Sequence, residues 1–225
     1  AQRGIRQAMA AGTALVGDIS NTLVTHPLLV EAGLPAVLFY ELLGFNTPEP
    51  EGVVAVARAR LAALPSSADV RTTLAPHAPY SVSPDLFGAI RGDVDRAGDY
   101  TSTVHLGESP EEVEFLRSGT GPSRDHLESL GLWTGEWTAP GSTPVEYLET
   151  LGFFGGRALI VHGVQLGGND LDRLRAVGAT LVSCPRSNQY VGVGAPPLEA
   201  FYAMDVEVAF GTDSLASVDD LNLFA

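Results

Sequence analysis

Val104-His105-Leu106-Gly107-Glu108 is a short apolar run that ends in a histidine and, three residues later, in a carboxylate. We interpret residues 101–106 as a strand, because a short apolar run bounded by turn residues is typical of a buried strand. A histidine at a strand end is a candidate metal ligand, and the glutamate beyond it is a candidate general acid/base. If this hypothesis is correct, other strands of the same sheet should also end in polar groups.

The same pattern recurs along the chain. Apolar segments predict seven strands, at residues 13–20, 35–41, 70–75, 101–106, 158–162, 179–184 and 206–211. Helices are predicted at residues 51–64, 170–176 and 197–204, after Ser83-Pro84 and Ser109-Pro110, and at the N-terminus, where Ile5, Ala8, Met9 and Gly12 form an amphipathic face. Each Ser-Pro pair predicts a helix start, because serine caps the helix and proline suits its first position.

Strands that alternate with helices predict right-handed βαβ units around a parallel sheet. Two architectures are consistent with this order, a doubly wound sheet and an eight-stranded barrel. A doubly wound sheet should carry a glycine-rich phosphate loop after an early strand, and neither G-x-G-x-x-G nor the P-loop pattern is present. Polar residues follow the ends of different strands, where barrel active sites assemble: His77, His105, Glu108, His162, Asn188 and Asp213. We therefore predict an α/β fold, an incomplete (β/α)8 TIM-like barrel that contains about strands 2 to 8.

We interpret residues 1–225 as one barrel domain with an insertion at about 119–142. The insertion is rich in Gly, Pro, Ser and Thr and contains Trp133 and Trp137. Its length predicts a lid or a specificity element, with Trp133 as a candidate substrate-binding residue. The alternative is that both tryptophans only anchor a long loop to the body.

The composition is that of a globular protein, with 45% hydrophobic and 18% charged residues. The formal net charge of -14 repels phosphate backbones and argues against a nucleic-acid partner. A single cysteine, Cys184, cannot form an internal disulfide, which fits a reducing compartment. No apolar run is long enough to span a bilayer, and residues 1–6 do not lead into a signal-peptide core. We expect a cytoplasmic protein with no membrane partner and a small-molecule substrate; whether it forms a homo-oligomer is open.

Imidazoles and carboxylates from separate strands can meet at a barrel mouth and bind zinc or a similar divalent ion. His105 and Asp213 are the first candidates, because small residues around Asp213 allow close approach and nearby hydroxyls can orient its carboxylate. Glu108 could take a proton from metal-bound water, whose pKa falls to roughly 7, and pass it to a leaving nitrogen. Considered singly, Asp213 also suits a helix cap, Glu108 a first-turn charge, and His162 a buried histidine bonded to a carbonyl.

Five motifs, in this order, resemble the strand-end motifs of the amidohydrolase superfamily. They are Ala75-Pro76-His77-Ala78-Pro79-Tyr80-Ser81, His105-x-x-Glu108, His162-Gly163-Val164-Gln165-Leu166, Cys184-Pro185-Arg186-Ser187-Asn188 and Gly211-Thr212-Asp213-Ser214. The resemblance covers nearly the whole chain. It is strongest to the branch of chlorohydrolases and of S-adenosylhomocysteine, methylthioadenosine and aminodeoxyfutalosine deaminases.

The resemblance implies a role for each matching residue. His105 and Asp213 would bind a single metal, usually zinc with iron as an alternative, together with two histidines of an H-x-H motif on the first strand. Glu108 would shuttle the proton. His162 would bond the attacking water or the tetrahedral intermediate, and it becomes a further metal ligand if it moves inward. His77 would contact the substrate, and Arg186 and Asn188, whose exact role is open, are treated as substrate-binding candidates.

The reaction that the resemblance implies is hydrolytic deamination of an aminopurine nucleoside-like substrate by metal-activated water. All 13 basic residues are Arg, so the carboxylated lysine that bridges two metals in other members is excluded and one metal is expected. The alternatives are hydrolysis of another C–N or C–Cl bond, as in guanine deaminases or triazine chlorohydrolases, and a non-catalytic truncated barrel. A sugar-phosphate barrel enzyme ranks last, because no glycine-rich phosphate site follows the seventh strand.

The sequence departs from the family pattern at both ends. The H-x-H motif is absent, and so are the last barrel helix and the small β-sandwich that members build from their termini. Seven strands would leave two unpaired edges. We therefore expect weak metal binding and little activity from this polypeptide alone, whether it is a fragment, a natural truncation or a chain completed by a partner.

Overall fold

The computed structural model describes residues 1–98, 101–154 and 157–224. The strands are β1 (Val16–Ser20), β2 (Ala36–Leu42), β3 (Val70–Pro76), β4 (Thr101–Leu106), β5 (Arg157–His162), β6 (Thr180–Ser183) and β7 (Glu207–Phe210). The helices are α1 (Gln2–Ala10), α2 (His26–Ala32), α3 (Pro50–Ala62), α4 (Pro84–Ala97), α5 (Pro110–Ser118), α6 (Pro122–Ser129), α7 (Pro144–Thr150), α8 (Gly168–Val177), α9 (Pro185–Val191) and α10 (Leu198–Ala203). All seven predicted strands are therefore confirmed.

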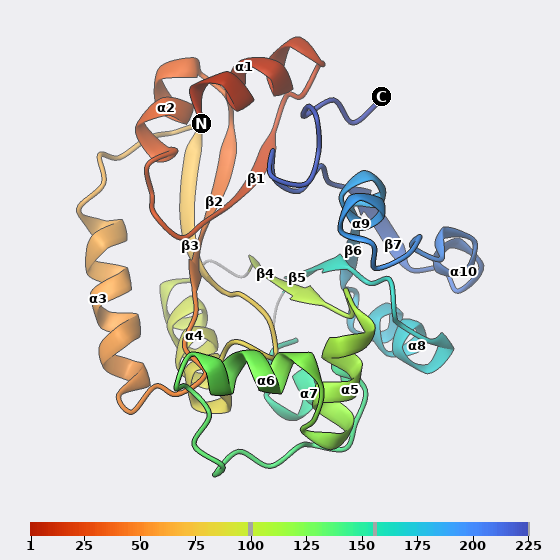
Figure 1. Ribbon diagram of the computed structural model, residues 1–225. Coiled ribbons are helices and arrows are strands. Elements are labelled where there is room, and N and C mark those ends of the chain that lie inside the picture. Colours follow the sequence, from red (N-terminus) through yellow and green to blue (C-terminus); the bar gives the residue numbers. More distant parts are fainter. Residues whose placement is uncertain (99–100, 155–156, 225) are drawn as a thin grey trace.

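The strands pair in parallel in two sheets, with the orders β1-β2-β3 and β4-β5-β6-β7. A backbone hydrogen bond of 2.9 Å from the N–H of His105 to the carbonyl of His77 links the two sheets just past the end of β3. Figure 1 shows the strands in the middle of the molecule, with α3 on one side and α8 and α10 on the opposite side. The parallel α/β architecture is the one that the sequence predicts.

The main core lies between the strands and the surrounding helices. Leu38, Leu74, Val104, Ile160 and Leu181, one from each of five strands, are at most 1% exposed and belong to one apolar cluster. Burying a side chain of this size contributes roughly 1.5–3 kcal/mol. Because side chains alternate along a strand, the neighbours of these residues point to the inner side of the curved sheets. Glu41 and His105 are on that inner side.

Two helix starts follow the predicted chemistry. The hydroxyl of Ser83 accepts the N–H of Leu86, and the hydroxyl of Ser109 accepts the N–H of Glu112, with a proline at the first helical position in each case. Four helices, α2, α6, α7 and α9, were not among the predicted ranges, because segments of seven or eight residues give too few turns for a clear period. In the described parts of the chain no helix is both long and apolar enough to cross a bilayer.

The segment 119–142 contains α6 and packs through aromatic side chains. Trp137 stacks on Phe115 of α5, with ring centroids 4.5 Å apart and an interplanar angle of 6°. Trp133 stacks on Phe45, which follows β2, with centroids 5.9 Å apart. Both tryptophans therefore fix the segment to the body, as the anchoring alternative requires; a lid or specificity role stays a prediction.

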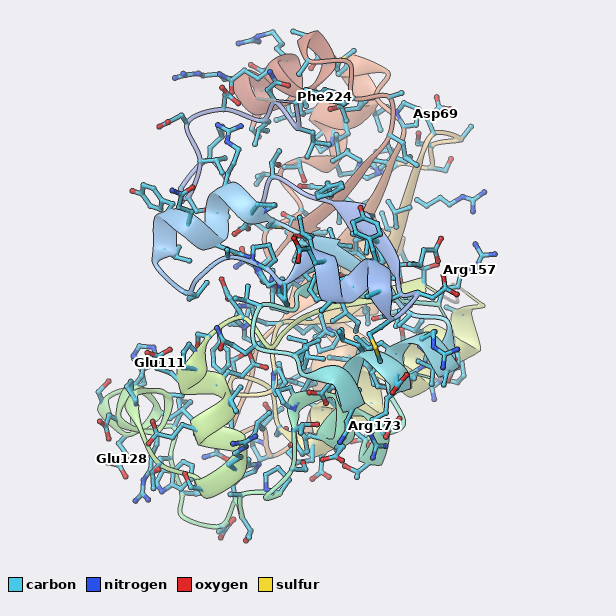
Figure 2. The ribbon with its side chains drawn as sticks, turned by 90° about the vertical axis from the view of Figure 1, so that its right-hand side faces the viewer. Asp69, Glu111, Glu128, Arg157, Arg173 and Phe224 are labelled. Atoms are coloured by element: carbon cyan, nitrogen blue, oxygen red, sulfur yellow. The ribbon has the colours of Figure 1, made fainter. Side chains whose placement is uncertain are left out.

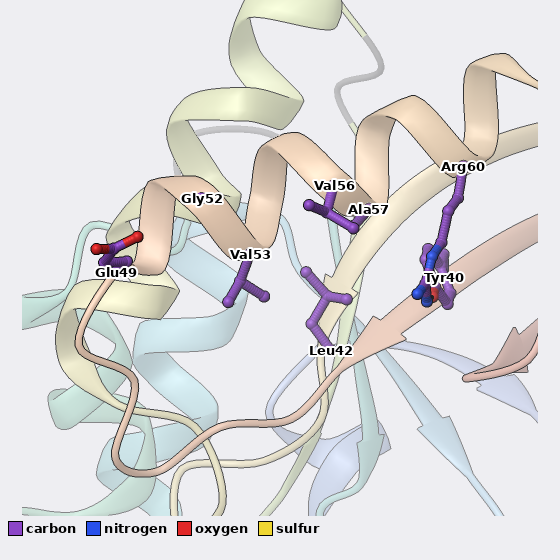
Figure 3. A pocket seen from close by; sticks show the side chains of 8 residues that line it. All are labelled: Tyr40, Leu42, Glu49, Gly52, Val53, Val56, Ala57 and Arg60. Carbon is purple, nitrogen blue, oxygen red and sulfur yellow. The ribbon is translucent and has the colours of Figure 1, made fainter.

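A pocket of about 500 Å³ lies between β2 and α3, on the outer side of the sheet (Figure 3). Tyr40 and Leu42 line it from the strand, and Arg60 donates to the Tyr40 hydroxyl at 2.8 Å. Glu41 lies between these two residues in the sequence and points to the opposite face of β2. The pocket is thus separated from the inner side by the sheet.

Candidate active site

Three histidines form a row at the carboxyl ends of neighbouring strands. His77 follows β3, His105 is near the end of β4, and His162 ends β5. The ring centroids of His77 and His105 are 5.2 Å apart, and those of His105 and His162 are 5.1 Å apart. The strand ends thus bring together three of the residues that the sequence singles out.

Both ring nitrogens of His162 make polar contacts with neighbouring side chains. Its Nδ1 lies 2.9 Å from Oδ1 of Asn188, and its Nε2 lies 3.0 Å from Nδ1 of His105. Burial lowers the pKa of His162, so the ring is neutral near pH 7. Because an amide oxygen only accepts, the single proton sits on Nδ1, and Nε2 presents a lone pair toward His105.

The backbone of His162 has a positive φ of 78°, and that of Asp213 has a φ of 59°. Residues other than glycine rarely adopt this left-handed conformation, which costs about 1–2 kcal/mol. This left-handed backbone conformation turns the side chain of His162 away from the direction that strand alternation would give it. Such outliers are concentrated at functional sites.

His105 faces a carboxylate on its other side. Its Nε2 lies 3.4 Å from Oε1 of Glu41 on β2. Burial alone lowers the pKa of His105, but the hydrogen bond and charge of Glu41, with the charges of Asp213 and Glu108, raise that pKa above its ordinary value. Glu41 was not among the predicted site residues, although its place at the end of an apolar strand is the signal that identified the others.

Glu108 lies on the turn after β4, with Oε1 3.6 Å from Nε2 of His162. The buried Glu112 shapes this turn, because its two carboxylate oxygens accept the N–H groups of Gly107 at 2.9 Å and of Glu108 at 3.1 Å. Burial raises the pKa of Glu112 to about 7, against the opposing effect of the two N–H donors. Glu112 was not among the predicted site residues, and the Ser109-x-x-Glu112 spacing of a capping box is the signal that the sequence holds for it.

His77 is oriented by a hydroxyl. Its Nδ1 lies 2.5 Å from Oγ of Ser81, and the rings of His77 and Tyr80 form a T-shaped pair with centroids 5.7 Å apart. Burial lowers the pKa of His77 to about 4, with Glu41 acting in the opposite direction. At neutral pH the ring is therefore uncharged, and Nε2 is left for a ligand.

Asp213 lies in the segment after β7, and its carboxylate is oriented by hydroxyls. Oδ2 accepts from Oγ of Ser187 on α9 at 2.6 Å and from Oγ of Ser217 at 3.3 Å. Orienting hydroxyls were predicted, but from the adjacent residues Thr212 and Ser214. The side chain of Asp213 is exposed.

The donors present suit a divalent ion of the zinc type, which takes imidazole nitrogen and carboxylate oxygen. Among the residues that the structure describes, one set of three has ligand atoms that all lie within 4.8 Å of one another, and it consists of Glu41, His77 and His105. Asp213 is not part of that set. The predicted ligands His105, His162 and Asp213 are therefore less closely grouped, and their assignment stays a prediction.

Arg186 and Trp133, two further predicted substrate-binding residues, contact other parts of the protein. Nη1 of Arg186 donates to Oδ1 of Asp220 and to the carbonyl of Asn222, each at 2.9 Å, which ties α9 to the C-terminal segment. Trp133 lies in the aromatic cluster, with the guanidinium of Arg124 4.8 Å from its ring. Contact of either residue with a substrate stays a prediction.

The whole chain, residues 1–225, matches the model of the amidohydrolase family. It therefore belongs to that family, and the resemblance and the TIM-barrel class inferred from the strand-end motifs are confirmed.

Individual relatives agree with this assignment. Aminodeoxyfutalosine deaminase of Deinococcus radiodurans is 34% identical over 232 residues, which cover 99% of this chain and 55% of the relative. The crystal structure of Helicobacter pylori aminofutalosine deaminase with methylthio-coformycin is 28% identical and superimposes with a TM-score of 0.88 over 99% of this chain and 54% of that one. An adenosine deaminase from Xanthomonas campestris with bound zinc is 25% identical, with a TM-score of 0.79 over 98% of this chain and 46% of that one. The chain thus spans about half the length of the curated relatives that it matches.

Proposed function

We propose that this chain provides most of the catalytic face of a divalent-metal-dependent hydrolase that deaminates an aminopurine nucleoside-like substrate. The observation that carries the proposal is the row of His77, His105 and His162 with Glu108 beside it, on the strand ends of an amidohydrolase. The relatives named as aminodeoxyfutalosine, aminofutalosine and adenosine deaminases support the substrate class.

His105 and Asp213 are the proposed ligands for one divalent ion, with His162 as a further ligand if its ring moves inward. Zinc is the proposed metal, with iron as an alternative; the zinc-bound relative and the imidazole and carboxylate donors support zinc. A divalent ion bound there would act as a Lewis acid that makes water nucleophilic at neutral pH. Ser187 and Ser217 support this role, because their hydroxyls hold the Asp213 carboxylate in one orientation.

Side chains of this chain would transfer the protons in the reaction. Water adds to the ring carbon that bears the amino group, the C–N bond breaks and ammonia leaves, while Glu108 carries the proton from the water to the leaving nitrogen. Nε2 of His162, 3.6 Å from Glu108, offers an acceptor for the attacking water. Asn188 acts through His162, and the neutral His77 presents Nε2 to the base.

The test is ammonia release by the full-length gene product from a panel of aminopurine nucleosides. Glu108→Gln should abolish turnover and leave metal content unchanged, since the amide cannot carry a proton and Glu108 is not a proposed ligand. Glu111→Gln is the matched control, because Glu111 lies at the outer surface of α5 (Figure 2). No ammonia from any nucleoside with metal present would reject deamination, and unchanged turnover in Glu108→Gln would reject the role of Glu108.

A further inference from the structure

Gln165 connects two segments of the active site that carry different polar side chains. It follows His162 in the loop between β5 and α8. Its backbone N–H donates to the carbonyl of Gly107 at 2.8 Å. Its side-chain Nε2 donates to the carbonyl of Val193 at 3.0 Å. The main chain of Gln165 therefore binds the turn after β4, which carries Glu108, and its side chain binds the segment after α9.

Val193 is joined in turn to Asn188. The carbonyl of Asn188, on α9, accepts the N–H of Gly192 at 3.1 Å and that of Val193 at 3.2 Å. The side chain of Asn188 contacts His162, with Oδ1 2.9 Å from Nδ1. These contacts form a closed ring. From His162 the ring follows the chain to Gln165, whose side chain crosses to Val193. From Val193 it returns through Asn188 to the imidazole.

The segment after α9 is one whose backbone a single hydrogen bond can restrict. Gly192 has a φ of 80° and Gly194 a φ of 108°, and both residues are exposed. Glycine leaves the backbone more conformational freedom than any other residue. Val193, between them, is half-buried and presents its carbonyl to Gln165. The amide of Gln165 therefore fixes a segment that its own residues leave flexible.

A fixed ring of contacts matters because the backbone of His162 is strained. His162 has a φ of 78° and Gly163 a φ of 66°. A left-handed conformation at a residue other than glycine persists only where the surrounding structure imposes it. The N–H of Gly163 donates to the carbonyl of Leu106 at 3.0 Å, and the two hydrogen bonds of Gln165 hold the chain just beyond this reversal. Gln165 thus helps to keep the imidazole turned toward Asn188.

We propose that Gln165 is a positioning residue of the active site, whose side-chain amide holds Asn188 against His162 through the segment after α9. In this role Gln165 acts through Asn188 and does not touch the substrate. Its effect on turnover rests on the proposed function, whereas its hold on the segment does not. The sequence singles out residues 162–166 as one motif but assigns no role to Gln165.

The first test is steady-state ammonia release by the full-length gene product. Gln165→Met removes the donor at similar side-chain length, so kcat should fall about three- to tenfold, the usual effect of losing one hydrogen bond. KM should stay within about twofold of wild type. Gln165→His carries a ring N–H at the same number of bonds from the backbone and should restore most of kcat. Gln189→Met, an exposed change on α9, is the matched control.

Wild-type kcat in Gln165→Met would overturn the proposal, and so would a rise in KM alone, which would indicate contact with the substrate. Thermal melting checks that each variant is folded at the assay temperature. If Gln165→Met does not fold, Gln165→Asn replaces it, because that change draws the amide back from Val193 by one methylene.

A double-mutant cycle tests whether Gln165 acts through Asn188. In Asn188→Ala the end of α9 no longer holds the imidazole, so adding Gln165→Met should lower kcat by less than about twofold more. Losses of kcat that multiply would mean that the two residues act independently, and would overturn the proposal.

Hydrogen–deuterium exchange tests the same link without any activity. In Gln165→Met the amides of residues 190–194 should exchange at least about threefold faster than in wild type or Gln189→Met. Those of residues 103–108 should keep wild-type rates, because the bond to Gly107 comes from the backbone. Equal exchange at residues 190–194 would overturn the proposal. If the full-length product releases no ammonia from any nucleoside, the proposed function fails, and the exchange rates decide alone whether Gln165 holds this segment.

Discussion

Nδ1 of His162 lies 2.9 Å from Oδ1 of Asn188, and both side chains are at most 1% exposed. The amide oxygen can only accept, so this contact fixes the imidazole proton on Nδ1 and leaves Nε2 as an acceptor. It also restrains a ring whose backbone has a φ of 78°. Asn188 thereby decides which nitrogen of His162 faces His105 and Glu108.

Asn188→Ala should lower kcat of the full-length gene product by about 10–100-fold, the usual cost of removing a group that orients a site histidine. KM should change little, because the imidazole remains in place but loses its fixed tautomer. Asn188→Asp keeps an acceptor and should retain more activity than Asn188→Ala. Steady-state ammonia release measures both constants. Asn169→Ala, an exposed change on α8, serves as the control; wild-type kcat in Asn188→Ala would contradict the positioning role.

The carboxylate of Glu112 holds the turn that carries Glu108, so Glu112→Gln should impair turnover without touching a reacting group. The amide that replaces it has one accepting oxygen, and its NH₂ group would oppose the second backbone N–H. We expect kcat to fall by at least tenfold, with metal content unchanged. The exposed neighbour Glu111 provides the control through Glu111→Gln. Equal kcat values for the two variants would show that the turn does not need Glu112.

Glu112 should also leave a pH signature in stability. Burial raises its pKa in the folded chain to about 7, from an ordinary value of 4.5. Between these pH values the folded chain binds more protons than the unfolded chain, so the free energy of unfolding should fall as pH rises from 4.5 to 7. The difference in the free energy of unfolding, wild type minus Glu112→Gln, should decrease by at most about 3 kcal/mol as pH rises through this window. Outside the window this difference should not change with pH. Urea unfolding at stepped pH measures the difference, and a rise with pH would refute it.

The sequence predicted the strands because most are short and largely apolar, and it located His77, His105 and His162 because polar residues at the ends of parallel strands share one face. The sequence could not predict which side chains these histidines contact. The register places His162 opposite Leu106, which points into the outer core, and only the positive φ at His162 turns its ring inward. Likewise, Ser187 lies on the helix at residues 185–191, which brings its hydroxyl to Asp213. That helix is too short to show a hydrophobic period, so the contact could not be predicted from the sequence.

Gly107→Ala should destabilise the fold through two separable effects. Gly107 has a φ of 62°, which costs a residue with a Cβ about 1–2 kcal/mol. A Cβ would also lie 2.5 Å from Cδ2 of Leu166. Gly131 has a φ of 67° with nothing within 4 Å, so Gly131→Ala measures the first effect alone. We expect the free energy of unfolding in urea to fall by at least about 1 kcal/mol more in Gly107→Ala, and equal losses would show that Leu166 moves freely.

Trp133→Ala should lower the free energy of unfolding by about 2–3 kcal/mol, because it removes the stack on Phe45 and the contact with the Arg124 guanidinium. Trp133→Phe keeps a ring for that stack and should lose less than about 1 kcal/mol. Leu130→Ala, an exposed change in the same segment, should be near neutral. If the ring only anchors the segment, KM of Trp133→Phe stays at the wild-type value. A several-fold rise in KM at unchanged stability would instead show that Trp133 contacts the substrate.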